Sequence, residues 1–98
     1  MDIETQKHDA STLALLALGW ALQDERRAER LLTLTGLTPD ILRGAASQPQ
    51  TQAAILQFLE NHEPDLIACS VAIDASPEAL VAARRELDGA DANREFEI

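Results

Sequence analysis

The sequence is poor in aromatic residues and cysteine, and each shortage excludes a class of protein. Its 98 residues include one tryptophan, two phenylalanines, no tyrosine and a single cysteine, Cys69. One cysteine cannot form a disulfide within the chain, and it cannot supply the ligand set of a usual structural zinc site. Because 46% of the residues are hydrophobic and only 3% aromatic, the core must be aliphatic and rich in alanine. The sequence predicts one globular domain.

Basic residues and long apolar runs are also scarce. Eight Lys and Arg stand against seventeen Asp and Glu, which gives a net charge of −9. That charge opposes binding to nucleic acid and to anionic membranes, so neither is an expected partner. The most apolar run, residues 13–22, is about half of the ~18 residues needed to span a bilayer. The first four residues lack the basic region of a secretory signal, and a cytoplasmic location is expected.

What is present is a series of helix signals that predict an all-α fold, a compact bundle of about six short helices. One helical domain is expected at residues 10–89, with flexible termini at 1–9 and 90–98. Helix N-caps are predicted at Asp9 or Ser11 and at Asp24. Two more are predicted at Thr38 and Ser76, and each of these two residues precedes a proline and an acid. Gly36 and Gly89 are the expected ends of the second and the sixth helix. The fourth helix is predicted at residues 50–61.

The segment at residues 65–74 is ambiguous. Its apolar residues would also suit a buried strand. No second strand-like run exists to pair with it, so a fifth helix beginning near Pro64 is predicted.

The first helix is apolar on nearly all sides. Leu13, Leu16, Ala17 and Trp20 follow the spacing of one helical face, which places Trp20 in the core. Three more leucines, at positions 15, 18 and 22, occupy its other sides. Such a helix is either central to the bundle or part of a subunit interface. The glycine within this helix, Gly19, indicates that a second helix crosses it closely at this position.

An internal repeat with an offset of 38 residues aligns the start signals at Thr38 and Ser76. The same offset places Trp20 on Phe58 and Leu42 on Leu80. Two interpretations stay open: a duplicated three-helix unit packed about a pseudo-twofold axis, or convergence of helix starts on the same capping residues.

Several segments together resemble a known family. They are Leu18-Gly19-Trp20-Ala21 with Asp24, the run at residues 30–37, Leu42-Arg43, the run at residues 55–59 with Glu63, and Pro77-Glu78 with Ala83-Arg84. The pattern is similar to an uncharacterised bacterial, typically alphaproteobacterial, family of short helical proteins, domain of unknown function number thirty-five seventy-two. The resemblance covers roughly residues 13–89. It implies a compact helical protein and brings no catalytic residue or ligand. At residues 25–29 the chain departs from the family's pattern.

Candidate chemical groups are few. His8 lies in the expected flexible N-terminus, and His62, Asp65 and Cys69 have a spacing that could be written as a metal site. Pro64 interrupts any helix shared by the first two of these, so no metal site is expected. The apolar neighbours of Cys69 indicate a buried structural thiol and not a nucleophile. The four glycines are isolated, which does not support a phosphate-binding loop. No catalytic, cofactor-binding or metal-binding residue is predicted.

Two basic clusters could carry a docking patch. One contains Arg26, Arg27 and Arg30, and the other contains Arg84 and Arg85. Pairing of Asp24 with Arg27 and of Glu29 with Arg26 favours instead a helix surface that neutralises itself.

These observations predict a small non-catalytic cytoplasmic helical protein, not an enzyme, that acts by homodimerisation or by docking to another protein. The alternative is a small-molecule-binding domain or minor enzyme with a cavity between helices, served by Arg43, His62 or Arg84. A third hypothesis, a DNA-binding helix at residues 77–88 with Arg84 and Arg85 outward, is opposed by the negative charge.

Overall fold

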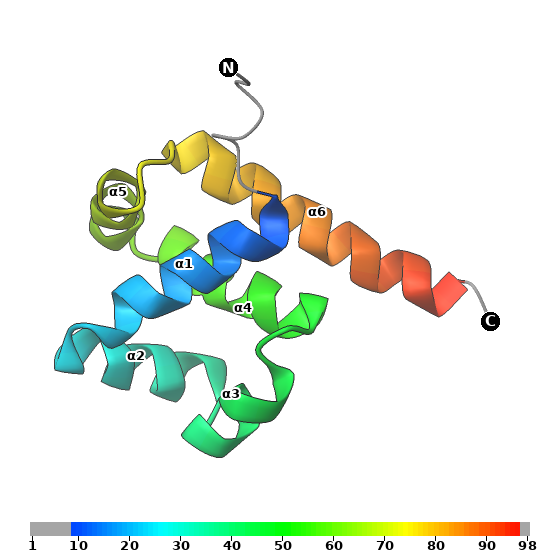
Figure 1. Cartoon of the computed structure of the whole chain (residues 1–98), viewed down its shortest axis with the longest axis horizontal. Coiled ribbons are helices and arrows are strands. Elements are labelled where there is room, and N and C mark those ends of the chain that lie inside the picture. Colours follow the sequence, from blue (N-terminus) through cyan, green and yellow to red (C-terminus); the bar gives the residue numbers. More distant parts are fainter. Residues whose placement is uncertain (1–8, 97–98) are drawn as a thin grey trace.

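Six α-helices make up the part of the chain that the structure describes (Figure 1). This computed structural model describes the backbone of residues 9–96 and the side chains of residues 9–89, and it contains no strand within that part. The helices are α1 (Ala10–Leu22), α2 (Glu25–Thr35), α3 (Pro39–Ala45), α4 (Pro49–Glu60), α5 (Glu63–Ala72) and α6 (Pro77–Phe96). The predicted all-α bundle is therefore confirmed. Of the N-terminus expected to be flexible, residues 1–9, the first eight lie outside the described residues and Asp9 is the N-cap of α1.

The predicted helix boundaries rest on side-chain caps that the structure contains. The carboxylates of Asp9 and Asp24 accept hydrogen bonds from backbone N–H groups at the starts of α1 and α2. Gly36 ends α2 with φ of +75°, the left-handed conformation that glycine adopts without a steric cost. The two hydroxyl caps are also formed, because Thr38 Oγ1 accepts from the Ile41 N–H at 3.1 Å and Ser76 Oγ from the Ala79 N–H at 3.0 Å.

Replacing either hydroxyl cap is expected to destabilise the fold. Thr38→Ala and Ser76→Ala should each lower the free energy of unfolding by about 1 kcal/mol, because one N–H of the first helical turn loses its acceptor. Urea denaturation followed by circular dichroism measures the change. Ser47→Ala, at an exposed turn position, is the matched control and should leave the midpoint unchanged. Equal midpoints for all three variants would contradict the capping role.

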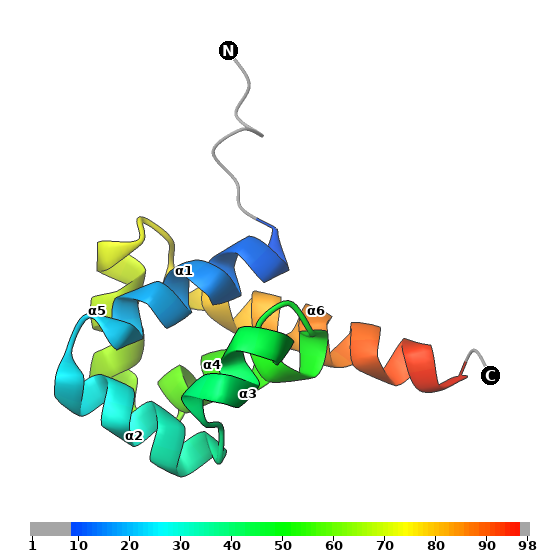
Figure 2. The ribbon, with the colours of Figure 1, turned by 60° about the horizontal axis from the view of Figure 1, so that its bottom comes forward.

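Helix α6 is longer than the sequence signals indicate. The predicted end at Gly89 is wrong, since the helix continues to Phe96. An interior glycine costs only about 1 kcal/mol relative to alanine, and no proline follows it to stop the helix. The expected non-helical tail at residues 90–98 is therefore helical as far as Phe96. Figures 1 and 2 show this last part of α6 extending away from the other helices.

The ambiguous segment at residues 65–74 is helical as predicted. Helix α5 begins at Glu63, with Pro64 in its first turn, where no N–H is needed. Cys69 and Ser70 are its buried residues, while Val71 is 76% exposed. Among the described residues, no single helix is long and apolar enough to cross a bilayer. Only α5 and the first part of α6 together are long and apolar enough for a membrane span, and the two helices meet at an angle of 101° across the break between them.

The core lies where α1, α4 and α6 pack against one another. The buried face of α1 consists mainly of alanine, which lets these helices approach closely. Trp20 is 9% exposed, so its predicted core position is confirmed. Leu16, predicted on the same stripe, is 38% exposed, and that assignment is wrong. A helix turns 100° per residue, so the Leu16 side chain points about 100° away from the centre of the buried face of α1. Alanines and not leucines make up most of that face.

The 38-residue offset is visible in the burial pattern. Every buried position between Leu13 and Leu42 has a buried counterpart 38 residues later, Leu31 matching Cys69 and Leu42 matching Leu80. The starts of α4, α5 and α6 correspond in the same way to those of α1, α2 and α3. This pattern favours a repeated three-helix unit. The two copies differ most in the third helix, which has 7 residues in α3 and 20 in α6.

Candidate interaction surface

The side of α1 that faces away from the core is apolar and uncharged. Leu15, Leu16 and Leu22 are 43%, 38% and 47% exposed, and Gly19 lies exposed between them. The helix contains no charged residue along its 13 positions. We call these four residues the α1 face. Three exposed leucines therefore lie on the side of α1 that faces away from the core.

Gly19 does not have the role that the sequence predicts for it. A Cβ placed on this residue would meet no atom within 4 Å among the described residues. No helix of the described chain therefore crosses α1 closely at this position, and the prediction of such a crossing within the monomer is wrong. The glycine leaves a smooth interval between the exposed leucines of the α1 face.

A hollow of about 520 Å³ adjoins the α1 face where α1 meets the end of α5. Ala72, Ile73 and Asp74 form its far wall. The remaining lining residues belong to α1 and its C-cap: Leu15, Leu16, Gly19, Trp20 and Gln23. The apolar surface of α1 therefore continues into a concave region with one carboxylate.

Beneath this surface, Trp20 is held in place by Arg27 of α2. The Arg27 guanidinium lies 3.8 Å from the centre of the indole ring, and its Nη2 donates a hydrogen bond of 2.7 Å to the Trp20 carbonyl. Such a cation–π contact favours a planar, delocalised cation over the ring. Arg30 stands in a similar relation to Phe58, at 5.8 Å. Arg27 and Arg30 thus serve as packing groups for the rings of Trp20 and Phe58.

The three residues whose spacing resembles a metal site, His62, Asp65 and Cys69, are only partly brought together. His62 Nδ1 lies 3.0 Å from Asp65 Oδ2, and Arg30 donates a hydrogen bond to the same carboxylate oxygen. Within residues 9–89 there is no group of three His, Cys, Asp or Glu side chains able to hold a metal ion. The Asp65 carboxylate therefore joins the start of α5 to α2. His62 is the N-cap residue of α5, although its side chain makes no capping hydrogen bond.

Cys69 is a fully buried thiol, as predicted. Burial raises its pKa to about 11, and the nearby Asp65 carboxylate acts in the same direction, while the Arg27 cation opposes it. The thiolate is the reactive form of cysteine, so the folded chain holds this group in its unreactive state.

Labelling of Cys69 is expected to report unfolding. At pH 8, a thiol reagent should modify the folded chain at least about 100-fold more slowly than the chain in urea, where the thiol has its ordinary pKa of about 8.5. Between pH 9 and 11 the unfolded chain loses this proton while the folded chain keeps it, so the free energy of unfolding should fall as pH rises. Cys69→Ala should remove that part of the pH dependence. Equal labelling rates with and without urea would contradict the buried placement.

The basic clusters are largely neutralised by neighbouring acids. Arg84 makes a two-point contact with Glu60, at 2.6 and 3.2 Å, and a third bond to Asp88 at 2.8 Å. Arg27 lies 3.8 Å from Asp24, as predicted. The predicted pair between Glu29 and Arg26 is wrong, since no ion pair joins them in the described part of the chain.

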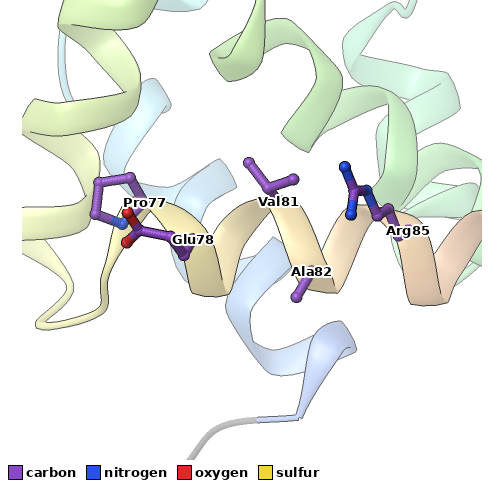
Figure 3. A pocket seen from close by; sticks show the side chains of 5 residues that line it. All are labelled: Pro77, Glu78, Val81, Ala82 and Arg85. Atoms are coloured by element: carbon purple, nitrogen blue, oxygen red, sulfur yellow. The ribbon is translucent and has the colours of Figure 1, made fainter.

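The helix suggested for DNA reading does not present both of its arginines. Arg84 is turned toward Glu60 of α4, so only Arg85 is exposed. A surface depression of about 360 Å³ is lined by Arg85 together with Pro77, Glu78, Val81 and Ala82. Figure 3 shows these five side chains along α6. All five residues come from α6, so among the described residues one helix alone lines this depression.

A second apolar groove, of about 330 Å³, lies between α1, α2 and α3. Its walls are the aliphatic side chains of Leu18, Leu22, Leu32, Pro39 and Leu42. Arg43 is the one charged residue of the lining, and its guanidinium is 2.6 Å from Asp40. Of the three residues expected to serve a cavity, Arg43 therefore lines one. Arg84 is paired with Glu60 and Asp88, and His62 is paired with Asp65.

Sequence reasoning missed the exposed apolar residues outside α1. Leu34 of α2, Ile41 of α3, and Ile67 and Val71 of α5 are all exposed. Ile67 and Val71 are four residues apart and therefore share a helix face. That spacing is visible in the sequence, but only the position of the core shows that the face points outward.

The comparisons with known proteins concern the whole bundle. A family model described as "Protein of unknown function (DUF3572)" matches residues 7–90, which is most of the chain. No curated protein and no solved structure matches it.

Proposed function

Because the chain belongs to the DUF3572 family, whose description assigns no activity, we propose a function from its surface: it is a non-catalytic helical protein that binds another protein through the α1 face. The observation that carries this proposal is the half exposure of Leu15, Leu16 and Leu22 on a helix without any charged residue. Complete burial of a leucine side chain is worth about 1.5–3 kcal/mol, so a partner that covers this face gains substantial free energy.

The surroundings of the α1 face support binding rather than chemistry. Two partly buried carboxylates are held by neighbours: Asp65 by Arg30 and His62, and Glu60 by Arg84. Cys69 is buried and protonated. The hollow beside the face adds a concave region into which a side chain of the partner can fit.

Site-specific photo-cross-linking tests the proposal. A benzophenone amino acid is introduced in place of Leu16 in cells that naturally express the chain, and in place of Leu34 as a control of similar hydrophobicity on another helix. A strong adduct at position 16, absent at position 34 and lost when Leu22→Glu is added, is the expected result. Equal adducts at both positions would overturn the proposal.

A second candidate function follows from the groove that Arg43 lines. An apolar groove of about 330 Å³ with one cation matches the chemistry of a straight-chain carboxylate, which would replace the exposed Asp40 carboxylate as the partner of the Arg43 guanidinium. A carboxylate of about ten carbons should raise the melting temperature of the chain, whereas the corresponding alcohol should have a smaller effect. Arg43→Gln should abolish that difference. Identical shifts for both compounds would remove this candidate.

A further inference from the structure

One carboxylate without a counter-ion lies in the hollow beside the α1 face. Asp74 lines this hollow of about 520 Å³, and its lining contains no lysine, arginine or histidine. Within residues 9–89, no ion pair or side-chain hydrogen bond joins Asp74 to another residue. Five other carboxylates of the described chain each form an ion pair with an arginine: Asp24, Asp40, Glu60, Asp65 and Asp88. Asp74 differs from these five because its own chain does not neutralise it.

The backbone at Asp74 has a conformation that suits glycine better. Asp74 has φ of +60°, and it is the one non-glycine residue with positive φ in the described part of the chain. Its N–H donates a hydrogen bond to the Val71 carbonyl at 3.3 Å, and the N–H of Ala75 donates one to the Ser70 carbonyl at 2.9 Å, which is the usual end of a helix at a left-handed residue. The 38-residue offset pairs Asp74 with Gly36, which ends α2 with φ of +75°. The second three-helix unit thus has a carboxylate where the first has glycine, and the fold alone does not require that carboxylate.

The surroundings of Asp74 suit the side chain of a lysine or an arginine. Leu15, Leu16 and Ile73 provide aliphatic walls of the hollow, and Gln23 adds an amide. Lysine and arginine combine an aliphatic stem, which packs on apolar surface, with a cationic head that needs an acceptor. An unpaired carboxylate beside aliphatic walls therefore offers a contact to both parts of such a side chain.

The charge of the whole chain favours the same kind of partner. A net charge of −9 attracts a basic protein before contact and repels an acidic one, a second copy of this chain included. Helix α1 contains no charged residue, so the α1 face carries no cation that would repel a basic partner.

We propose that the partner of the α1 face is a basic protein segment, one of whose lysine or arginine side chains enters the hollow and pairs with Asp74. This inference rests on the proposed function and names the chemistry of its partner. The stem of that side chain packs against Leu15 and Leu16, and its cationic head lies against the Asp74 carboxylate. The bound segment covers this pair and excludes water from it, which strengthens the attraction between the two charges.

Binding of synthetic peptides tests the inference. Two amphipathic peptides of equal length carry the same leucines, and their polar positions are all lysine in one and all glutamine in the other. Each is titrated into the full-length chain by calorimetry at physiological ionic strength, where charges more than about 8 Å apart are largely screened. The lysine peptide should bind at least about tenfold more tightly than the glutamine peptide.

Two variants that each remove one carboxylate locate the site of binding. Asp74→Asn keeps a residue type that tolerates the left-handed conformation, and it should weaken binding of the lysine peptide at least about tenfold. Glu86→Gln, at an exposed position of α6 that does not line the hollow, changes the net charge equally and should alter binding by less than about twofold.

Asp74→Gly separates a binding role from a structural one. Glycine adopts positive φ without a steric cost, so the urea midpoint of this variant should be no lower than that of the wild type. Its binding of the lysine peptide should nevertheless be as weak as that of Asp74→Asn. A lower midpoint together with unchanged binding would assign Asp74 to the fold and overturn the inference.

The other outcomes distinguish this inference from the proposed function. Equal losses for Asp74→Asn and Glu86→Gln would mean attraction to the net charge alone and overturn the inference, as would equal binding of the two peptides or failure of the lysine peptide to bind the wild type. Sedimentation equilibrium that shows a wild-type dimer, lost in Leu16→Ser, would assign the α1 face to a second copy and also overturn it. If Leu16→Ser weakens peptide binding and Asp74→Asn does not, the proposed function stands and only this inference fails. Equal binding by the wild type and both of these variants would contradict the two together.

Discussion

Leu31→Ala is expected to lower the free energy of unfolding by about 2–5 kcal/mol, the range for truncating a buried leucine. Leu31 is fully buried, and it is the only buried residue of α2. The helix is also attached through Leu32, which packs against the core, Arg27, which stacks on Trp20, and Arg30, which bonds to Asp65. Since a small domain is stabilised by only about 5–15 kcal/mol, this one truncation removes a large part of the total.

Leu34→Ala makes the same chemical change on the same helix. Leu34 is 70% exposed, so its truncation should alter the free energy of unfolding by less than about 0.5 kcal/mol. Urea denaturation followed by tryptophan fluorescence suits both variants, because the single tryptophan is in contact with Arg27 of α2. A similar loss for the two variants would mean that α2 is not docked through Leu31.

Gln52→Glu is expected to have an effect that depends strongly on pH. Gln52 is 1% exposed, and its Nε2 donates hydrogen bonds of 2.9 Å to Ser11 Oγ and to the Ala46 carbonyl. The amide therefore connects α1, the end of α3 and α4. A carboxylate at this position keeps the size of the side chain, loses the donor, and places a buried charge beside a carbonyl oxygen. At pH 7 the variant should be destabilised by roughly 3–5 kcal/mol.

The direction of the pH effect follows from linkage. Burial raises the pKa of the introduced carboxyl above its unfolded value of about 4.3, so the folded state holds its proton to higher pH. Below about pH 4 both states are protonated and the penalty is small, and it grows as pH rises toward 7. Stability relative to the wild type is measured at pH 4 and pH 7. Gln57→Glu, at an exposed position of the same helix, should show little difference, and an equal loss for Gln52→Glu at both pH values would refute the argument.

Much of the fold could be predicted because its helix boundaries are set by local chemistry. The caps at Asp24, Thr38 and Ser76 and the left-handed Gly36 depend on residues within one turn of the boundary, so the sequence contains the necessary information. The end of α6 was predicted wrongly because the same logic was applied to Gly89, where no competing signal follows the glycine.

The orientation of helices could not be predicted with the same success. Leucines surround α1, and their spacing suits more than one choice of core side. The structure selects the alanine face because α4 and α6 approach α1 closely, which is a property of the packing of distant segments. The outward position of Leu16 and the contacts of Arg30 with Asp65 and Phe58 depend on that arrangement.

The position of α6 has a consequence for how the chain folds during synthesis. This helix is made after the other five described helices, yet it packs against α4 and α1, and its Leu80, Ala83 and Leu87 belong to the core. Contacts between the first and the last helix close a long loop, which slows folding relative to a bundle with only local contacts. A ribosome adds about 5–20 residues per second, so α1 waits for seconds with its alanine face uncovered. Because helices of both three-helix units share this core, we expect the native core to form only after α6 has left the ribosome.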